Sequence, residues 1–294
     1  MKPPPFEYAT PGSVDEVIEV LREAPDESSL LAGGQSLMPL LNMRMAQPGV
    51  IVDLNRTEDL SAIEWTPEGG VHLGSMVRQR RLETDPGLRD RLPLLTEAAR
   101  HIAHVPIRMR GTVGGSLAHA DPAAELPATV CALEGRLLVR GPEGQRAIPA
   151  GEFFLGPLTS AVGPGELLVA VEIDAPPEGT GWAFHEVART HGAFALTGAA
   201  ALLHVGEDGG IDLVRLALLG VGSVPYFPDW LDETAVGEAP AESLFRRIGE
   251  RVRDEVAPFD DVHASADYRR RVAGVLSARA LAEAAGRSNG RAPG

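Results

Sequence analysis

Arg110-Gly111-Thr112-Val113-Gly114-Gly115-Ser116-Leu117-Ala118-His119-Ala120-Asp121-Pro122 is the stretch that decides the fold of this 294-residue chain. A shorter glycine-rich turn, Ala32-Gly33-Gly34-Gln35-Ser36, lies upstream and leads into the apolar run Leu37–Leu41. Adjacent glycines let backbone N–H groups approach a charged oxygen, because no Cβ stands in the way. Successive N–H groups in such a turn form an anion-binding nest. The two turns together predict a grip on the two phosphates of a dinucleotide.

The first glycine turn belongs to a predicted α/β unit over about residues 1–56. Ser13-Val14-Asp15-Glu16 is a capping-box pattern, which predicts a helix that Pro25 ends. Ser29–Ala32 and Val50–Leu54 are short apolar runs typical of buried strands. The first glycine turn therefore follows the end of a strand.

A second α/β unit is predicted over about residues 57–176 and contains the longer glycine turn. Val71–Gly74, Leu137–Arg140 and Leu167–Ile173 are expected to be strands. Leu88–Ile102 has the apolar spacing of one helix. Asp121-Pro122 is a cap followed by proline at the first helical position, which predicts a helix over 122–133.

Asp174–Gly181 is rich in proline and glycine and is the best candidate for a linker. Three strands joined by short turns are expected beyond it, at Trp182–Arg189, Ala193–Val205 and Ile211–Val221, followed by two helices, at about Glu242–Val256 and Ala264–Ala285. The predicted fold class is α+β. We expect an α/β domain at 1–176, a C-terminal antiparallel sheet with helices at 177–286, and a disordered tail at 287–294.

Composition limits the function. The net charge of −14 argues against a nucleic-acid partner, which would require a basic face. No apolar run approaches the ~20 residues of a membrane span, and the N-terminus lacks the apolar core of a secretion signal. A cytoplasmic protein is expected. Cys131 is the single cysteine, so an iron–sulfur cluster, which normally takes four thiolates, cannot be held by this chain alone. We interpret Cys131 as a buried, inert thiol.

Taken alone, the two turns define only candidate anion nests. Neither is followed by Lys-Ser or Lys-Thr as in a Walker loop, and neither matches Gly-x-Gly-x-x-Gly. His101, His104 and His119 are close in sequence, but the accompanying carboxylate pattern of a metal site is absent. We expect no metal, and a role for His119 in fixing its loop.

Ala32–Asn42 and Arg110–Glu125 resemble the FAD-binding medium subunit of the molybdenum hydroxylases, the group that includes aerobic carbon monoxide dehydrogenase and xanthine dehydrogenase. Other similar stretches are Phe6–Tyr8, Pro48–Asn55, Ala103–Arg108, Glu152–Phe154, Glu166–Leu168, Asp260–His263 and Tyr268–Arg271. The resemblance extends from Phe6 to about Ala285. It implies a PCMH-type FAD-binding domain of two α/β subdomains, followed by a C-terminal flavoprotein domain.

The resemblance also implies a site. The first loop is expected to hold the FAD pyrophosphate through N–H groups, at Ala32, Gly33, Gly34, Gln35, Ser36 and Leu37. The second loop is expected to line the pyrophosphate and flavin, at Thr112, Val113, Gly114, Gly115, Ser116, Ala120 and Asp121. Glu125 matches an acidic position that contacts the cofactor, whereas Asp121 is equally well explained as a helix cap. Further expected contacts are Leu168, His185 and Phe194.

Two stretches depart from the family pattern. Ala193 stands where the family often carries aspartate, and Gly222–Pro228 differs from the usual Gly-Pro-Thr-Pro run. Both lie in the C-terminal part. They bear on the surroundings of the flavin and on the electron acceptor rather than on FAD binding.

The implied function is an electron-transfer flavoprotein subunit. A large partner would carry a molybdenum cofactor and a small partner two-iron clusters, in a dimer of heterotrimers. The partner would select the substrate, and the acceptor could be a quinone, NAD, oxygen or a protein. Two alternatives stay open: a stand-alone FAD-dependent oxidase or dehydrogenase, and a cofactor-free assembly module.

Overall fold

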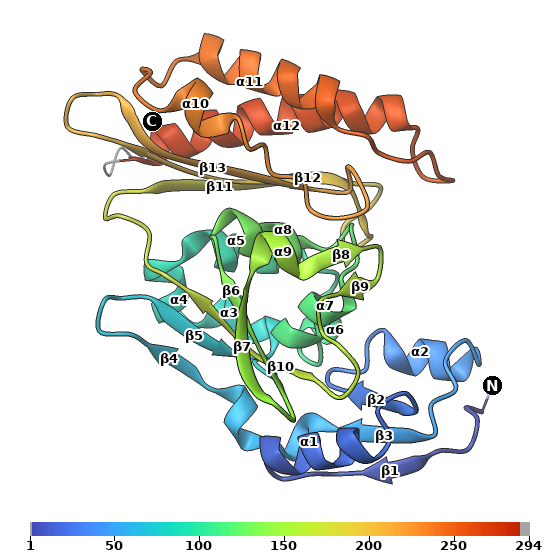
Figure 1. Cartoon of the computed structure of the whole chain (residues 1–294). Helices are drawn as coiled ribbons and strands as arrows, with labels where there is room; N and C mark the ends of the chain where they lie inside the picture. Colours follow the sequence, from blue (N-terminus) through green and yellow to red (C-terminus); the bar gives the residue numbers. More distant parts are fainter. Residues whose placement is uncertain (1, 289–294) are drawn as a thin grey trace.

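The three larger sheets follow one another along the chain and form three stacked units (Figure 1). A computed structural model describes residues 2–288. The first unit contains residues up to Asp53, the second contains the strands between Ile63 and Ile173, and the third begins at Gly181. The mixture of helices and sheets confirms the α+β class.

The N-terminal unit is a parallel sheet in the order β1-β3-β2. Its elements are β1 (Glu7–Ala9), α1 (Val14–Glu23), β2 (Ser28–Leu31), α2 (Leu37–Asn42) and β3 (Val50–Asp53). The predicted cap of α1 is formed, since Ser13 Oγ accepts the N–H of Glu16 at 3.3 Å. Val17 and Leu21 lie on the buried face of α1 and anchor it to the sheet. The turn after β2 therefore leads directly into the short helix α2.

The middle unit contains an antiparallel sheet in the order β4-β5-β10-β6-β7. Its strands are β4 (Ile63–Trp65), β5 (Val71–Gly74), β6 (Arg136–Gly141), β7 (Gly144–Pro149) and β10 (Leu167–Ile173), with a small hairpin of β8 (Phe154–Gly156) and β9 (Thr159–Ser160). Its helices are α3 (Gln79–Thr84), α4 (Pro86–Arg91), α5 (Pro93–His101), α6 (Val105–Arg108), α7 (Val113–His119), α8 (Glu125–Ala132) and α9 (Ala150–Phe153). Helices α5 and α8 lie between this sheet and the third one (Figure 1).

Two predicted helices have different bounds in the structure. The helix expected over 88–102 is two helices, α4 and α5, because Pro93 cannot donate the N–H that would continue α4. The helix expected from Pro122 begins at Glu125 as α8. Asp121 does act as a local cap, since its Oδ1 accepts the N–H of Ala123 at 2.9 Å, but it closes a turn rather than the first turn of a helix.

The C-terminal unit is an antiparallel sheet in the order β11-β12-β13, with helices on the face away from the rest of the chain (Figure 1). Its elements are β11 (Gly181–Ala188), β12 (Ala195–Val205), β13 (Ile211–Leu219), α10 (Leu231–Ala235), α11 (Glu242–Glu255) and α12 (Ala266–Arg287). Successive residues of β11 face opposite sides, because side chains alternate along a strand. Phe184 packs into the core shared with α5 and α8, whereas Ala183 packs into the core under α11 and α12.

The predicted tail begins later than expected. Arg287 is the last residue of α12; its guanidinium lies over the ring of Trp182 and donates to the Trp182 carbonyl at 2.8 Å. Ser288 accepts the N–H of Val205 at 2.9 Å. Residues 289–294 of the predicted tail lie outside the described residues.

A pair of glycines sets the distance between α11 and α12. A Cβ on Gly249 would lie 2.3 Å from the carbonyl oxygen of Gly274, and a Cβ on Gly274 would lie 2.5 Å from that of Gly249. The helices therefore touch backbone to backbone. Any larger residue at the crossing must push them apart.

We expect Gly274→Ala to lower the free energy of unfolding by about 1–3 kcal/mol, because overpacking at the crossing outweighs the higher helix propensity of alanine. Gly286→Ala is the matched control in the same helix, since a Cβ there meets no atom within 4 Å. Urea denaturation of both variants measures the difference. Equal stability of the two would contradict the close crossing.

Candidate functional site

A cleft of about 1120 Å³ lies where the three units meet. The N-terminal unit contributes Ala32–Leu37, and the middle unit contributes the second glycine loop together with Glu125 and Leu168. The C-terminal unit contributes residues from Arg189 to Leu196, and His263. Its volume exceeds that of the usual pocket for a drug-sized ligand, so the cleft suits a large, extended molecule.

The two glycine loops touch each other through their backbones. A Cβ on Gly33 would lie only 2.4 Å from the carbonyl oxygen of Arg110 and 2.8 Å from the Cα of Gly111. Gly114 meets a similar constraint, because its Cβ would lie 2.4 Å from the Cβ of Ser75. Glycine is thus required at Gly33 for packing between the first and middle units, and at Gly114 for packing within the middle unit.

The loops differ in the state of their N–H groups. Within residues 2–288, no hydrogen bond engages the backbone N–H groups of Gly33, Gly34, Gln35 or Ser36. Gly34 has φ of +73°, a left-handed conformation that turns successive N–H groups toward one side. The first loop therefore has the donors of an anion nest at the edge of the cleft.

The second loop has no such nest, and this corrects the prediction from sequence. Val113 N–H donates to the Val77 carbonyl at 2.9 Å, and Gly114 N–H donates to the Ser75 carbonyl at 2.8 Å. Gly115 N–H donates to Thr112 Oγ1 at 3.0 Å, which caps α7. These three N–H groups already donate to acceptors within the chain. The second loop therefore lines the cleft without offering them to an anion.

The side chains of Asn55 and Arg78 link the two loops through hydrogen bonds. Asn55 Nδ2 donates to the Ala32 carbonyl at 3.1 Å, and Arg78 Nη2 donates to Asn55 Oδ1 at 2.5 Å. Arg78 Nη1 also donates to the Arg110 carbonyl in the second loop. Burial, together with the nearby charge of Arg110, lowers the pKa of Arg78 from its ordinary value. Arg78 therefore links the loops through one guanidinium.

The inner wall carries a buried carboxyl. Glu125 lies at the first position of α8, is 8% exposed and lines the cleft. Burial, with the nearby carboxylate of Glu186 as the second cause, raises the pKa of Glu125 to about 8. The Glu125 carboxyl is consequently protonated at neutral pH and can donate a hydrogen bond into the cleft.

The C-terminal unit closes the outer side of the cleft. Gly192 has φ of +78° and lies against the ring of His104, where a Cβ would come within 2.3 Å of Cε1. The rings of His104 and His191 are 5.7 Å apart, with an edge-on orientation. Phe194 lines the cleft and is 75% exposed. An aromatic side chain thus stands at the entrance.

Most predicted site residues lie on the cleft. These are Ala32, Gly33, Gly34, Gln35, Ser36, Leu37, Thr112, Gly114, Gly115, Ser116, Asp121, Glu125, Leu168 and Phe194. Three lie elsewhere. Val113 is buried beneath the loop, and Ala120 is the left-handed residue that ends α7. His185 Nε2 lies 2.8 Å from Glu283 of α12, so His185 faces the helical layer and is removed from the site.

Sequence analysis missed part of the lining between the loops. Ser75 Oγ and Gln79 Oε1 are buried and have no hydrogen-bond partner within the described chain, although both residues line the cleft. Such unpaired polar atoms are expected where a polar ligand completes the site. The available signal was the position of Ser75 directly after the predicted strand 71–74.

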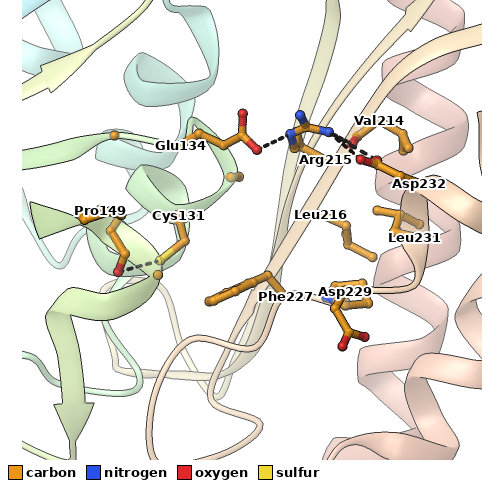
Figure 2. A pocket seen from close by; sticks show the side chains of 15 residues that line it. Cys131, Glu134, Pro149, Val214, Arg215, Leu216, Phe227, Asp229, Leu231 and Asp232 are labelled. Carbon is orange, nitrogen blue, oxygen red and sulfur yellow. Dashed lines mark hydrogen bonds and ion pairs between the residues drawn. The ribbon is translucent and has the colours of Figure 1, made fainter.

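Cys131 lies on a separate cavity of about 380 Å³ between α8 and the C-terminal sheet (Figure 2). Its Sγ lies 3.6 Å from the Ala150 carbonyl oxygen, and burial raises the pKa of the thiol to about 12. Arg215 bridges the cavity, 2.6 Å from Glu134 and 3.2 Å from Asp232. Cys131 is therefore a buried thiol that does not line the larger cleft.

Among residues 2–288, no group of three histidine, cysteine, aspartate or glutamate side chains could hold a metal ion. His104 and His119 line the cleft, whereas His101 lies beside Glu186, with Nδ1 at 3.6 Å from Oε1. No helix in the described part of the chain is long and apolar enough to cross a membrane.

The cleft fits a dinucleotide with a flat ring system. Free N–H groups of the first loop suit a pyrophosphate, Ser75, Gln79 and Glu125 offer polar contacts, and apolar residues such as Leu168 and Leu196 suit a ring. These features are those of a site for a dinucleotide cofactor.

Family models agree with this assignment. Residues 4–176 match the FAD binding domain in molybdopterin dehydrogenase, and residues 182–284 match the CO dehydrogenase flavoprotein C-terminal domain. The chain belongs to the family of FAD-binding medium subunits of the molybdenum hydroxylases, which confirms the resemblance.

Individual relatives match over nearly their full length. The caffeine dehydrogenase subunit beta of Pseudomonas sp. is 38% identical over 98% of this chain and 97% of its own. The carbon monoxide dehydrogenase medium chain of Hydrogenophaga pseudoflava is 34% identical over 96% and 97%. The solved carbon monoxide dehydrogenase from Hydrogenophaga pseudoflava superimposes with a TM-score of 0.95, covering 98% of this chain and 100% of that one. Quinoline 2-oxidoreductase from Pseudomonas putida gives a TM-score of 0.91 at 36% identity, covering 97% and 98%.

We expect Gly33→Ala to weaken FAD binding by about five- to 150-fold, because a Cβ there forces the first loop away from Arg110 at a cost of about 1–3 kcal/mol. Gly156→Ala is the control, since a Cβ at Gly156 meets no atom within 4 Å. Fluorescence titration of FAD with each purified chain gives the dissociation constants. Unchanged affinity in Gly33→Ala would contradict the assigned role of the loop contact.

The raised pKa of Glu125 predicts a pH dependence of stability in the FAD-free chain. The folded chain keeps the proton to about pH 8, whereas the unfolded chain releases it near the ordinary value of 4.5. The free energy of unfolding should fall as pH rises through this interval, by up to about 1.4 kcal/mol per pH unit. Glu125→Gln removes that contribution, and the exposed control Glu152→Gln retains it. Parallel urea titrations between the two pH limits measure the slopes.

Proposed function

We propose that this chain is the electron-transferring flavoprotein subunit of a molybdenum hydroxylase complex. A large partner subunit with a molybdenum cofactor oxidises the substrate, and a small partner subunit with two-iron clusters passes the electrons on. FAD bound to this chain would supply the redox chemistry that links these clusters to an external acceptor. The finer details, including a dimer of heterotrimers and a cytoplasmic location, belong to the same proposal.

The observation that carries the proposal is the row of free N–H groups at Gly33–Ser36 on a large cleft. A pyrophosphate is the part of FAD that needs such a nest. The division of labour is supported by Cys131, the single cysteine, because this chain cannot supply the thiolates of an iron–sulfur cluster. The clusters must then come from another chain.

The chain's own residues bind, orient and shield the cofactor. FAD, when bound, supplies the redox chemistry. The N–H groups of Gly33–Ser36 would hold the pyrophosphate, Ser75 and Gln79 would supply polar contacts, and Glu125 would donate a hydrogen bond. Phe194 limits access at the entrance. We propose the bounds 1–176 for the FAD-binding domain, with subdomains at about 1–56 and 57–176, and 177–286 for the C-terminal domain.

The proposal leaves substrate selection to the partner. Relatives of comparable identity are named for caffeine, for carbon monoxide and for nicotine, so similarity in this subunit does not follow the substrate. The choice of electron acceptor depends on the residues at the entrance of the cleft. Ala193 is one of these residues, and it offers no carboxylate.

Two other functions remain to be tested against the proposal. A stand-alone FAD oxidase would turn over a substrate without partners. A cofactor-free assembly module would not need the unpaired N–H groups of the first loop, or Ser75 and Gln79, to face the cleft.

We expect the purified chain to bind FAD with saturable quenching of flavin fluorescence and to retain an equimolar flavin spectrum after desalting. Co-expression with candidate large and small subunits should yield a complex that reduces an acceptor, whereas the isolated holo-chain should oxidise no substrate. Turnover by the isolated chain would favour the oxidase, and failure to bind FAD both alone and in the complex would favour the assembly module.

A further inference from the structure

The first glycine loop makes hydrogen bonds through its carbonyl oxygens but not through its N–H groups. In the part of the chain that the structure describes, the N–H groups of Gly33–Ser36 have no acceptor. By contrast, the Gly34 carbonyl accepts the N–H of Met38 at 3.2 Å, and the Ser36 carbonyl accepts the N–H of Leu40 at 3.3 Å. These two acceptors are therefore directed into α2, which leaves the donors of the loop for a ligand.

Two side-chain carboxamides hold the first two carbonyl oxygens of the loop. Gln35 Nε2 donates to the Gly33 carbonyl at 3.0 Å, within the loop itself. Asn55 Nδ2 donates to the Ala32 carbonyl at 3.1 Å, from a position just after β3. Asn55 does not line the cleft. It therefore acts on the loop without being placed to touch a ligand there.

Planarity of the peptide bond transmits the hold on a carbonyl to the next N–H group. In a trans peptide the C=O and the following N–H point in opposite directions. The Ala32 carbonyl points to Asn55, so the N–H of Gly33 points away from Asn55. The hold of Gln35 on the Gly33 carbonyl sets the direction of the Gly34 N–H in the same way. Such holds matter here because glycine adopts more backbone angles than other residues.

The carboxamide of Asn55 is itself fixed in one orientation. Its Oδ1 accepts Nη2 of Arg78 at 2.5 Å, and its Nδ2 also donates to Oδ1 of Asp53. A guanidinium only donates and an ionised carboxylate only accepts, so the amide cannot be reversed. Burial raises the pKa of Asp53, but hydrogen bonds from Tyr8 and Asn55 outweigh it and lower the pKa below its ordinary value. Asp53 therefore stays an acceptor at neutral pH.

We propose that Asn55 is a positioning residue for the FAD pyrophosphate, because its carboxamide holds the Ala32–Gly33 peptide with the Gly33 N–H turned toward the anion. The inference rests on the proposed function. Arg78 strengthens the hold, since a charged donor on Oδ1 polarises the amide and with it the next hydrogen bond in the chain. A donor that is already oriented loses little freedom when the anion binds. Asn55 thus contributes to affinity without a contact of its own.

The first test measures FAD affinity by fluorescence titration of the full chain. Asn55→Leu keeps the approximate size of the side chain and removes its donor, so FAD should bind about two- to tenfold more weakly. Asn55→Asp places an acceptor opposite the Ala32 carbonyl and should weaken binding by about ten- to 100-fold. Wild-type affinity in Asn55→Asp would overturn the proposal.

Asn42→Asp is the matched control for the added negative charge. Asn42 is the last residue of α2 and is exposed, and no hydrogen bond engages its side chain among residues 2–288. We expect this variant to bind FAD as the wild type does. An equal loss of affinity in Asn42→Asp and Asn55→Asp would assign the effect to charge and overturn the role of the carboxamide.

The second test observes the phosphates, because a weaker fold would also lower the affinity. Phosphorus NMR of the FAD-saturated full chain should give shifted phosphate resonances in Asn55→Leu and Asn55→Asp, with an unchanged visible spectrum of the flavin. Asn42→Asp should keep the wild-type phosphate resonances. Weakened binding with unchanged phosphate resonances in the Asn55 variants would show a purely structural role and overturn the proposal.

A measurement on the wild type keeps the proposal falsifiable if both Asn55 variants fail to fold. Amide NMR spectra of the full chain, compared without FAD and at saturation with FAD, should show the Gly33 N–H proton moving downfield, because it donates to the pyrophosphate. An unmoved Gly33 resonance in a chain that binds FAD would overturn the positioning role. A wild-type chain that binds no FAD would instead refute the proposed function.

Discussion

The contact between the backbones of the two glycine loops is the constraint on which the rest of the site depends. Gly33 lies against the Arg110 carbonyl, and Gly114 lies against Ser75. The contact at Gly33 leaves no room for a side chain and holds the first unit against the middle one, whereas the contact at Gly114 fixes the second loop within the middle unit. Arg78 then braces both loops with one guanidinium. The free N–H groups of the first loop are thereby held at the edge of the cleft at no cost to binding.

The sequence was sufficient for short apolar strands and for a helix whose first turn is capped by serine. Strands 71–74 and 167–173 have the predicted bounds, and the cap at Ser13 is formed. The prediction of a single helix across Pro93 was wrong. The apolar periodicity continues across this residue, but the helical hydrogen bonding of the backbone does not. Local pattern alone therefore identified elements better than it identified their breaks.

The site was predictable in part for a physical reason. A glycine pair in the sequence indicates that the backbone closely approaches another group. It does not indicate whether that group is a ligand or another part of the chain. In the first loop the N–H groups remain free, whereas in the second Ser75 and Val77 accept them. The prediction that His185 contacts the cofactor was wrong for a related reason. The sequence alone did not reveal which face of β11 would be covered by α12. The hydrogen bonding of the second loop and the orientation of His185 both depend on tertiary contacts with residues far away in sequence.

Cys131 has one more consequence. It is the single thiol of the chain, and it lies buried on the cavity between α8 and the C-terminal sheet. A thiol in that place is a natural reporter group for the boundary between the middle and C-terminal units. Burial slows the reaction of the sulfur with an alkylating reagent, and separation of the boundary or unfolding of the chain exposes it. The rate at which this one sulfur is alkylated therefore reports how often the boundary between the two units opens, and no engineered cysteine is needed.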